Sequence, residues 1–432
     1  MKICVFGLWH LGTVTSACLA SKGYQVIGLD LDETVIKELN IGQPPLFEPG
    51  LKKLINEGIA KNKLFFTIDI KQAVRGAKII WITHDTSVDG NDKADVDFVK
   101  EQIVRIFPYL KNGQQILISS QMPVGSVRYL EELFAKEYPN VCVSISCSPE
   151  NLRLGKAIDV FMHPSRVIIG VRNDITKKIY SELLKPFTNH IEWMSIESAE
   201  MTKHALNAFL ALSVTFINEI ATICEQVGAD AKEVERGLKS EARIGQKAYL
   251  SPGEAFAGGT LARDVAFLTQ LSKDNNIPVR LISSIKTSND MHKTWAYRQL
   301  TQLLGDLNGK TVAVWGLTYK PNTNTLRRSS AIELCEWLLK KGAQVKAHDP
   351  EVKSLPDELK QIKLYASPLD AIKKADALVV ATEWAVYHCV KMNKVISAMN
   401  TPYILDANCF LEDVIKMFPK IKYVSVGRIT KQ

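Results

Sequence analysis

Apolar and polar residues alternate along the first part of the chain in a way that predicts repeated strand and helix units. Between residue 2 and about residue 196, amphipathic segments separate short apolar runs that read KICVF, YQVIGLD, KIIWIT, QQILISS, VCVSISCS, RVIIGV and HIEWMSI. Buried strands that alternate with helices build parallel sheets. We therefore predict a Rossmann-like α/β domain over residues 1–196.

The pattern changes after about Ser198. From there to Leu304 the strand signals vanish, and the segment MTKHALNAFLALSVTFINEIATICEQV repeats apolar residues at intervals of three and four, which predicts a long helix. We expect a central helical region over residues 197–304. Because a long helix between two sheets commonly serves as a dimer contact, we also expect a homodimer or a higher homo-oligomer.

The strand and helix pattern returns at Lys310, with TVAVWGLTYK, AIELCEWLLKKG, AQVKAHD, ALVVAT and YILDA. The stretch VFGL…SKGYQVIGLDLD near the N-terminus is echoed by VWGL…KKGAQVKAHDPE in the last third, which indicates an internal repeat. A second Rossmann-like domain is predicted over residues 305–432. The expected fold class is α/β, with two parallel-sheet domains joined by the central helical region.

Composition narrows the class of protein. With 432 residues, 46% hydrophobic and 23% charged, the chain is typical of an enzyme of two or three domains. A formal charge of +8 suits an anionic substrate such as a nucleotide, whereas scattered lysines speak against a nucleic-acid partner. The eight cysteines form no C-x-x-C pair and have no histidine at a zinc interval, so we predict no metal site and reduced thiols in the cytoplasm.

The N-terminal apolar stretch resembles a short signal peptide, but the glycines and the histidine inside it favour a strand, a turn and a helix. No other stretch approaches the length of a membrane span, so no membrane partner is expected.

A glycine-containing turn joins the first strand to the first helix. It consists of Gly7, Leu8, Trp9, His10, Leu11 and Gly12. Asp30 ends the next strand, at the interval where a carboxylate meets the ribose hydroxyls of a dinucleotide. Trp9 departs from the motif, which has glycine at this position, and glycine turns also occur in α/β proteins that bind no nucleotide. The combination of strand, helix and acidic residue predicts that the turn binds a dinucleotide. NAD is expected rather than NADP, because Asp30 would repel the 2′-phosphate of NADP.

Several longer motifs occur in one order along nearly the whole chain. They read PPLFEPGL, SSQMPVGS, SPENLRLGKAIDVFMHPSRVIIG, SAEMTKHALNAFLA, FINEIATICEQVGAD, SPGEAFAGG and GKTVAVWGLTYKPNT. In this order and spacing the chain resembles the UDP-glucose/GDP-mannose dehydrogenase family. The resemblance implies an NAD-binding domain, a central helix with the dimer contact and a C-terminal domain that binds the nucleotide. It also implies oxidation of the C6 hydroxyl of a nucleotide sugar to a carboxylate with two NAD, as a step toward polysaccharide.

The resemblance also implies roles for individual residues. Lys203 and Asn207 match the family's catalytic lysine and asparagine, and their spacing places both on one side of a helix. There they would hold an oxyanion or a water. Glu150, in the motif SPENLR, would act as a base or position a water, and Asp264 would position a water. A solvated helix face and a surface glutamate are the alternatives for these positions.

Other positions that match the family are expected to bind ligands. The cofactor set includes Thr83, Gln121, Glu150 and Arg327 besides the glycine turn and Asp30. The substrate set comprises Leu152, Lys203, Asn207, Arg243, Tyr249, Phe256, Gly258 and Lys320. Arg243 resembles an arginine that reaches the nucleotide sugar from the partner subunit. Plain surface charge is the alternative for the basic residues.

The chain departs from the family most clearly in one loop. Family members typically read G-G-S-C-F-P-K-D, whereas this chain reads GGTLARD from Gly258 to Asp264, one residue shorter and without the cysteine. That cysteine forms the thiohemiacetal from which the second hydride leaves. Thr260 is the nearest replacement, but its hydroxyl needs a strong base to become a nucleophile. Near the C-terminus an expected arginine is missing, because D-G-R-N is replaced by DANC.

These departures leave three interpretations open. The chain is a nucleotide-sugar dehydrogenase that completes both oxidations, for example through the hydrated aldehyde. Alternatively it transfers a single hydride, or epimerises the sugar with retained NAD. The third interpretation is a protein that binds a nucleotide sugar without catalysis.

Overall fold

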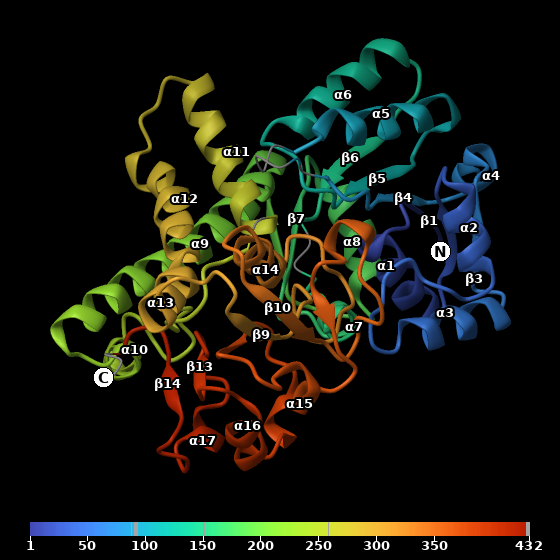
Figure 1. Ribbon diagram of the computed structural model, residues 1–432. Coiled ribbons are helices and arrows are strands. Elements are labelled where there is room, and N and C mark those ends of the chain that lie inside the picture. Colours follow the sequence, from blue (N-terminus) through green and yellow to red (C-terminus); the bar gives the residue numbers. More distant parts are fainter. Residues whose placement is uncertain (88, 90–93, 150–151, 258, 429–432) are drawn as a thin grey trace. The chain divides into compact units, whose positions relative to one another are not determined.

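The computed structural model describes residues 1–87, 89, 94–149, 152–257 and 259–428. Contacts along the chain divide it into two compact units, Met1–Leu206 and Asn207–Gln432. The boundary falls inside the long helix α9 (Ile196–Val227), shown in green in Figure 1. Each unit contains one sheet of its own.

The first unit is built on a sheet of eight strands. They are β1 (Lys2–Phe6), β2 (Gln25–Leu29), β3 (Leu64–Thr67), β4 (Ile79–Ile82), β5 (Gln115–Ile118), β6 (Ser144–Cys147), β7 (Val167–Gly170) and β8 (Ile191–Met194). The spatial order is β3-β2-β1-β4-β5-β6-β7-β8, and its first six strands have the Rossmann order. The predicted strands are confirmed, β3 is an addition, and β7 pairs antiparallel with β6 rather than parallel as expected.

Helices cover both faces of this sheet. They are α1 (His10–Ser21), α2 (Glu33–Asn40), α3 (Leu51–Ala60), α4 (Ile70–Val74), α5 (Val96–Ile106), α6 (Ser126–Glu137), α7 (Ala157–Met162) and α8 (Asp174–Leu184), with a 3-10 turn at Phe107–Tyr109. Along β1, Ile3 and Val5 enter one apolar core, while Cys4 and Phe6 enter another. Because neighbouring side chains of a strand point to opposite faces, a run of apolar residues without alternation marks a sheet that is buried on both sides.

The predicted central region is helical. Its helices are α9, α10 (Ala231–Ser240), α11 (Thr260–Asp274), α12 (Arg280–Lys293) and α13 (Trp295–Leu304). Among the described residues of 197–304 there is no strand. Helix α9 corrects one expectation, because it is long and apolar enough to span a membrane, with a mean hydropathy of 1.5 over 18 residues. Since 44% of that window is buried, and core helices pass the same test, length and composition alone are weak grounds for a membrane span.

The second sheet repeats the strand order of the first. It contains β9 (Thr311–Trp315), β10 (Gln344–His348), β11 (Lys363–Leu364), β12 (Ala377–Val380), β13 (Tyr403–Leu405) and β14 (Lys422–Val424) in the order β11-β10-β9-β12-β13-β14, with parallel pairing throughout. The helices of this part are α14 (Ser330–Lys340), α15 (Pro368–Ala371), α16 (Met392–Ala398) and α17 (Glu412–Ile415), with 3-10 turns at Asp357–Leu359 and Ala385–Cys389. The short edge strands β11 and β14 were not predicted.

The internal repeat extends to individual hydrogen bonds. In the first unit the backbone N–H of Leu8 donates to Asp30 at 2.7 Å, and in the second the N–H of Leu317 donates to Asp349 at 2.7 Å. The repeats differ in the distance from the turn to the next helix. Helix α1 begins at His10, whereas α14 begins only at Ser330, after the loop 317–329. The first turn therefore presents a helix N-terminus directly after its glycine, as a dinucleotide phosphate requires.

Candidate functional site

The glycine turn of the first unit has the close packing that a dinucleotide-binding turn needs. Gly7 has φ +99°, and a Cβ there would lie 2.7 Å from the backbone nitrogen of His84. At Gly12 a Cβ would lie 1.8 Å from the carbonyl oxygen of Gly7. Trp9 has φ −74° and an extended ψ, which any residue adopts, so its backbone does not require glycine. Its side chain is 41% exposed, and the departure from the motif leaves the turn intact.

Two side chains from the end of β4 lie beneath this turn. The buried Thr83 hydroxyl contacts the carbonyl oxygens of Phe6 and Gly7 at 3.1 and 2.8 Å and supports the turn from below. His84 packs edge-on against the ring of Phe6. Burial lowers the pKa of His84 to about 4, so the ring is neutral at neutral pH. His84 was not among the predicted site residues, although it directly follows Thr83 at the end of the buried strand β4.

The turn fits the predicted dinucleotide. The N-terminus of α1 has no side-chain cap, so its backbone N–H groups are available to a pyrophosphate. Asp30 is held beside the turn, because its two oxygens accept hydrogen bonds from the N–H groups of Leu8 and Asp32. A carboxylate in this position accepts hydrogen bonds from ribose hydroxyls.

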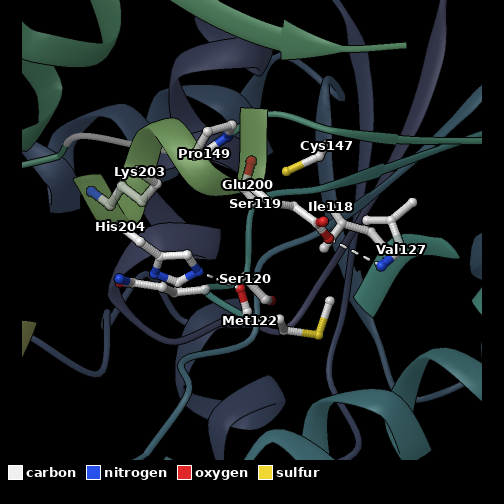
Figure 2. Close-up of a pocket in the computed structure, with 11 residues that line it drawn as sticks. Ile118, Ser119, Ser120, Met122, Val127, Cys147, Pro149, Glu200, Lys203 and His204 are labelled. Carbon is white, nitrogen blue, oxygen red and sulfur yellow. Dashed lines mark hydrogen bonds between the residues drawn. The ribbon is translucent and has the colours of Figure 1, made fainter. Parts of the chain in front are cut away.

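A small cavity lies in the same unit, at the carboxyl ends of β5 and β6 (Figure 2). Its volume is about 20 Å³. The lining residues are Ile118, Ser119, Ser120, Gln121, Met122, Val127, Cys147, Pro149, Glu200, Lys203 and His204. Lys203 and His204 reach it from the start of α9, and the ring of His204 lies 3.0 Å from the carbonyl oxygen of Met122. The structure thus brings the predicted residues Lys203 and Gln121 to one cavity.

Glu200 holds one wall of this cavity in place. Its carboxylate accepts hydrogen bonds from the backbone N–H groups of Gly125 and Val127, at 2.7 and 3.0 Å. These N–H groups lie at the start of α6, where no residue of that helix accepts from them. Burial outweighs these hydrogen bonds and raises the pKa of Glu200. Glu200 therefore fixes the segment after β5 to the helix that carries Lys203.

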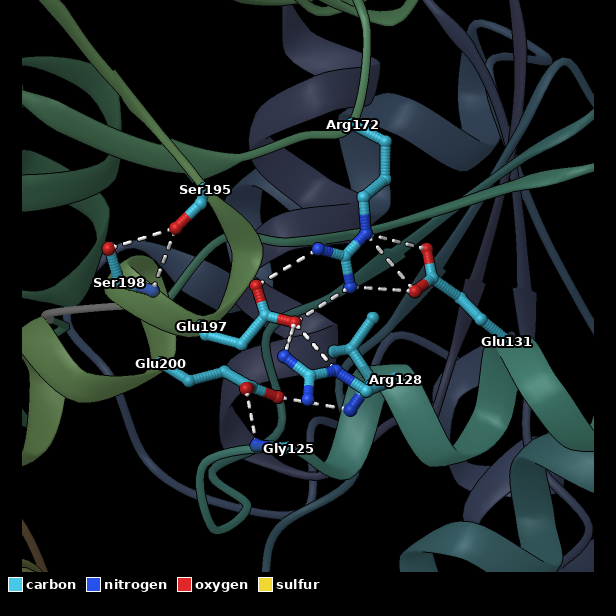
Figure 3. A network of polar contacts seen from close by, with 9 residues as sticks. Gly125, Arg128, Glu131, Arg172, Ser195, Glu197, Ser198 and Glu200 are labelled. Carbon is cyan, nitrogen blue, oxygen red and sulfur yellow. Dashed lines mark hydrogen bonds and ion pairs between the residues drawn. The ribbon is translucent and has the colours of Figure 1, made fainter.

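A network of ion pairs fixes the first turn of α9 (Figure 3). Arg172 contacts Glu131 at 2.8 Å and Glu197 at 2.9 Å, and Arg128 contacts Glu197 at 2.7 Å. The hydrogen bond from Arg172 is the main reason that the pKa of Glu197 falls to about 2. Bidentate arginine pairs are geometrically specific, so this network fixes the first turn of α9 to α6 and to the segment after β7.

Cys147 is the one cysteine among the described residues that lines this cavity. Sequence reasoning found no cysteine near the departing loop, and Cys147 lies far from it along the chain. Burial raises the pKa of the Cys147 thiol well above its usual value. A protonated, buried thiol is a poor nucleophile, so we do not expect Cys147 to replace the missing cysteine.

In the second unit Asn207 and Asp264 form a direct pair. The amide of Asn207 donates to the carboxylate of Asp264 at 2.5 Å, and both side chains are buried. Thr260 is the first residue of α11, one helical turn before Asp264, and is exposed. The predicted residues Asn207 and Asp264 are therefore brought together, with Thr260 on the same helix as Asp264.

Asparagine side chains hold the loop that precedes α11. Asn289 makes two hydrogen bonds with the backbone of Phe256, at 3.0 and 2.8 Å. Asn218 accepts from the N–H of Gly253 and donates to the carbonyl of Glu254. Sequence reasoning selected Phe256 but missed these asparagines. A polar residue at a buried position of a helix is the signal that would have found them.

Asn408 stands where the family has an arginine, and it contacts the same loop. Its side-chain oxygen accepts a hydrogen bond from the N–H of Glu254 at 2.8 Å. A Cβ at Gly253 would lie 2.1 Å from that oxygen, so the close approach requires glycine. Where the resemblance implies an arginine, this chain therefore has an uncharged side chain that fixes the loop.

Glu254, in this loop, is a carboxyl group with a strongly raised pKa. Burial, followed by the neighbouring Glu383 and Asp406, raises the pKa of Glu254 to about 8. The pKa values of Glu383 and Asp406 are also raised, chiefly by burial. Carboxyl groups that share one region of low polarity repel one another when ionised, so the Glu254 carboxyl retains its proton near neutral pH.

The predicted basic and aromatic residues of the second unit lie at its surface. Lys320 is exposed and lies over the ring of Tyr319, and Arg327 is also exposed. Arg243 contacts Glu241 at 2.9 Å with an exposed side chain, and Tyr249 is exposed as well. Their ligand-binding roles stay predictions.

Arg328, which sequence reasoning did not select, has φ +60°. Its Cδ lies 3.6 Å from the position of a Cβ on Gly259. Two consecutive arginines at 327 and 328 are the feature of the sequence that could have drawn attention to Arg328. Leu152 is half-buried, whereas the predicted residues Glu150 and Gly258 lie outside the described residues.

Comparisons with known proteins cover the whole chain. Three domains of the UDP-glucose/GDP-mannose dehydrogenase family match it: the NAD binding domain at residues 1–188, the central domain at 197–291 and the UDP binding domain at 313–413. A UDP-glucose 6-dehydrogenase of Rhizobium meliloti (strain 1021) is 34% identical over 437 residues, covering 99% of this chain and 100% of the relative. The UDP-glucose 6-dehydrogenase TuaD of Bacillus subtilis (strain 168) is 34% identical, covering 99% and 93%.

A solved structure has the same fold. It is a UDP-glucose dehydrogenase from the hyperthermophilic archaeon Pyrobaculum islandicum, which superposes with a TM-score of 0.88 at 24% identity. The match covers 99% of this chain and 98% of that one.

Thiol labelling tests whether Cys147 is inert. We expect iodoacetamide to modify the exposed residues Cys142 and Cys389 of the native protein within minutes, and Cys147 only after denaturation, because burial keeps it protonated. Peptide mass mapping over time measures each site. Rapid modification of Cys147 in the native protein, inhibited by a nucleotide sugar, would show that it is a reactive thiol of the site after all.

The raised pKa of Glu254 predicts how stability depends on pH. A folded-state pKa of about 8, against an ordinary value of 4.5, means that the native state binds the additional proton between these values. The contribution of this group to stability is therefore full below pH 4.5 and is lost as pH rises through about 8. Glu254→Gln should leave the melting temperature unchanged at pH 5 and raise it by roughly 2–4 °C at pH 8.5.

Differential scanning calorimetry at both pH values makes this measurement. Glu358→Gln, at an exposed glutamate, serves as the control and should shift neither midpoint. An equal effect of Glu254→Gln at pH 5 and pH 8.5 would contradict the assignment of the retained proton to Glu254.

Proposed function

Because the chain belongs to the UDP-glucose/GDP-mannose dehydrogenase family, we propose that it oxidises the C6 hydroxyl of a UDP-hexose to the carboxylate of a UDP-hexuronate. It is an NAD-dependent nucleotide-sugar dehydrogenase, as its full-length relatives are. The observation that carries the proposal is the hydrogen bond between Asn207 and Asp264. Asn207 lies on α9, one helical turn after Lys203. The three predicted domains, 1–196, 197–304 and 305–432, would bind the cofactor, provide the subunit contact and bind the nucleotide.

The residues of the first unit would hold the cofactor. NAD, when bound, accepts hydride from the sugar carbon. The N-terminus of α1 after Gly7 would bind its pyrophosphate, and Asp30 would bind its adenosine ribose. Thr83 acts indirectly, because it is buried beneath the turn and supports it. Gln121 would act from the cavity wall.

Lys203 and Asn207 would stabilise the charge that develops on the C6 oxygen. Lys203 is buried at the cavity, where a cation has a stronger effect on a developing oxyanion than it has in water. The amide of Asn207 is fixed by Asp264, so its orientation is set before substrate binds. Such preorganised donors avoid reorganisation during the reaction.

The second oxidation would proceed without a thiol. Thr260 is exposed at the start of α11, and a hydroxyl that no base activates is a weak nucleophile. We infer that water adds to the C6 aldehyde and gives a diol, with Asp264 orienting that water. Transfer of the C6 hydride of the diol to a second NAD, with release of one hydroxyl proton to solvent, would then give the carboxylic acid. The full-length dehydrogenase relatives favour this complete reaction over a single hydride transfer, an epimerisation or binding alone.

We further propose a homodimer formed through α9 and α12. Phe209, Phe216 and Ile223 repeat every seven residues along α9, and all three are exposed. Met291 is exposed on α12, which contacts α9 through the bond from Ser288 to Glu219. Exposed apolar stripes on helices of this length usually mark a protein contact. We propose that a second copy of this chain covers the exposed apolar residues. Arg243 would then reach the substrate of the other subunit across that contact.

The proposed location is the cytoplasm, where thiols stay reduced. All eight cysteines are free, and five of them are buried. The carboxylated sugar would serve as a precursor of polysaccharide.

Product analysis tests the reaction. The purified protein is incubated with NAD and UDP-, GDP- and dTDP-sugars, and NADH per sugar is measured together with the product mass. We expect two NADH and a carboxylate from a UDP-hexose. Thr260→Ala should retain this ratio, with a kcat within about threefold of the wild-type value, because water rather than the side chain attacks the aldehyde. Asp264→Asn should lower kcat by a factor of about 10²–10⁴.

One NADH with an aldehyde product, or no NADH with an isomerised sugar, would replace the proposed reaction by one of the alternatives. Loss of the second NADH in Thr260→Ala alone would show that Thr260 is the nucleophile.

The dimer is tested by light scattering on a size-exclusion column. Phe216, 45% exposed on α9, is replaced by glutamate, and we expect the mass to fall from that of a dimer to that of a monomer, because a charge in an apolar contact is costly. Met417→Glu, at an exposed residue outside α9 and α12, is the control and should leave the mass unchanged. A dimer that persists in Phe216→Glu would place the contact elsewhere.

A further inference from the structure

Glu48 is a buried carboxylate that joins two loops of the first unit. It lies between α2 and α3 and is 4% exposed. One of its oxygens lies 2.9 Å from the ring nitrogen Nε2 of His10 and accepts the N–H of Gly155 at 2.9 Å. The other accepts the N–H of Ala157 at 2.9 Å.

These contacts leave Glu48 ionised despite its burial. Burial by itself would raise the pKa of Glu48, but the hydrogen bonds from His10, Gly155 and Ala157 outweigh it and hold the pKa below its usual value. Hydrogen bonds to a charged acceptor are about twice as strong as those between neutral groups. Removal of one donor would leave part of a buried charge unsatisfied, so the three contacts stabilise one another.

The two ends of this link belong to different parts of the proposed site. His10 is the first residue of α1, in the turn that would bind the cofactor phosphates. Gly155 and Ala157 lie in the segment after Leu152, which is among the predicted substrate residues, and Ala157 begins α7. The segment is also fixed by packing, because Ala157 is buried in the same core cluster as Leu8.

We propose that Glu48 is a positioning residue that couples the cofactor turn to the substrate segment 152–157 through its contact with His10, so that a nicotinamide dinucleotide and a nucleotide sugar bind with positive cooperativity. The inference rests on the proposed function. A ligand that fixes the turn holds His10, His10 holds Glu48, and Glu48 then holds two backbone N–H groups of the substrate segment. The second ligand therefore meets a segment that is already ordered.

Binding measurements give the coupling directly. NADH is titrated with and without saturating UDP-glucose, a combination that does not react. Trp9, the adjacent and exposed indole, provides a fluorescence signal, and calorimetry provides an independent one. The ratio of the two Kd values is the coupling factor, which must be the same when UDP-glucose is titrated with and without NADH. We expect a factor of at least about five in the wild type.

Two variants break the link from its two ends. Glu48→Gln removes one carboxylate oxygen that accepts hydrogen bonds. His10→Phe removes the ring nitrogen that contacts Glu48. Because residue 10 is partly exposed, the His10→Phe protein should fold. In both we expect the coupling factor to fall to about one. His190→Gln is the matched control, because the exposed pair His190 and Glu192 lies in the same unit and touches neither loop. It should retain the wild-type factor.

Hydrogen exchange supplies a readout that does not depend on turnover. NADH alone should slow exchange at the amides of Gly155 and Ala157 in the wild type but not in His10→Phe. A folded His10→Phe protein that keeps the wild-type coupling factor and the slowed exchange would overturn the inference. Independent binding of both ligands by the wild type would overturn it too, while leaving the proposed function intact. Failure of the wild type to bind NADH would instead refute the proposed function.

Discussion

Buried and half-buried carboxylates that accept backbone N–H groups determine the shape of the loops around the proposed site. Loops at the carboxyl ends of parallel strands leave N–H groups without partners in the sheet, and burial of such groups is costly. Asp30 and Asp349 satisfy the turns after β1 and β9. Glu48 satisfies the segment before α7, and Glu200 satisfies the start of α6. Each carboxylate thereby fixes a loop that contains or adjoins a residue predicted to bind a ligand.

This arrangement explains how the chain tolerates its departures from the family pattern. Trp9 replaces a glycine, yet the positive φ that needs glycine lies at Gly7, and the turn is fixed by Asp30 rather than by residue 9. Asn408 replaces an arginine but clamps the loop through the N–H of Glu254. In both places a hydrogen bond to the backbone holds the loop.

The residues predicted to orient charge are held in place within each unit. Asn207 and Asp264 are buried and paired, and Lys203 lies at a cavity whose wall is held by Glu200. Cys147 lines the same cavity as Lys203, and burial keeps its thiol protonated. These contacts support the proposal that the site stabilises an oxyanion and that the second oxidation proceeds through water rather than through a thiol.

The sequence by itself determined the fold class, the central helical region and the internal repeat, because apolar periodicity directly reflects which faces of strands and helices are buried. Its motifs also predicted roles for Lys203, Asn207 and Asp264. Short edge strands such as β11 and β14 escaped, since a few residues carry little periodicity. Only the tertiary structure showed that Glu48 and Glu200 are buried acceptors, because their partners lie 107 and 75 residues away along the chain. Such pairings arise when packing brings distant loops together, and no local pattern of residues records them.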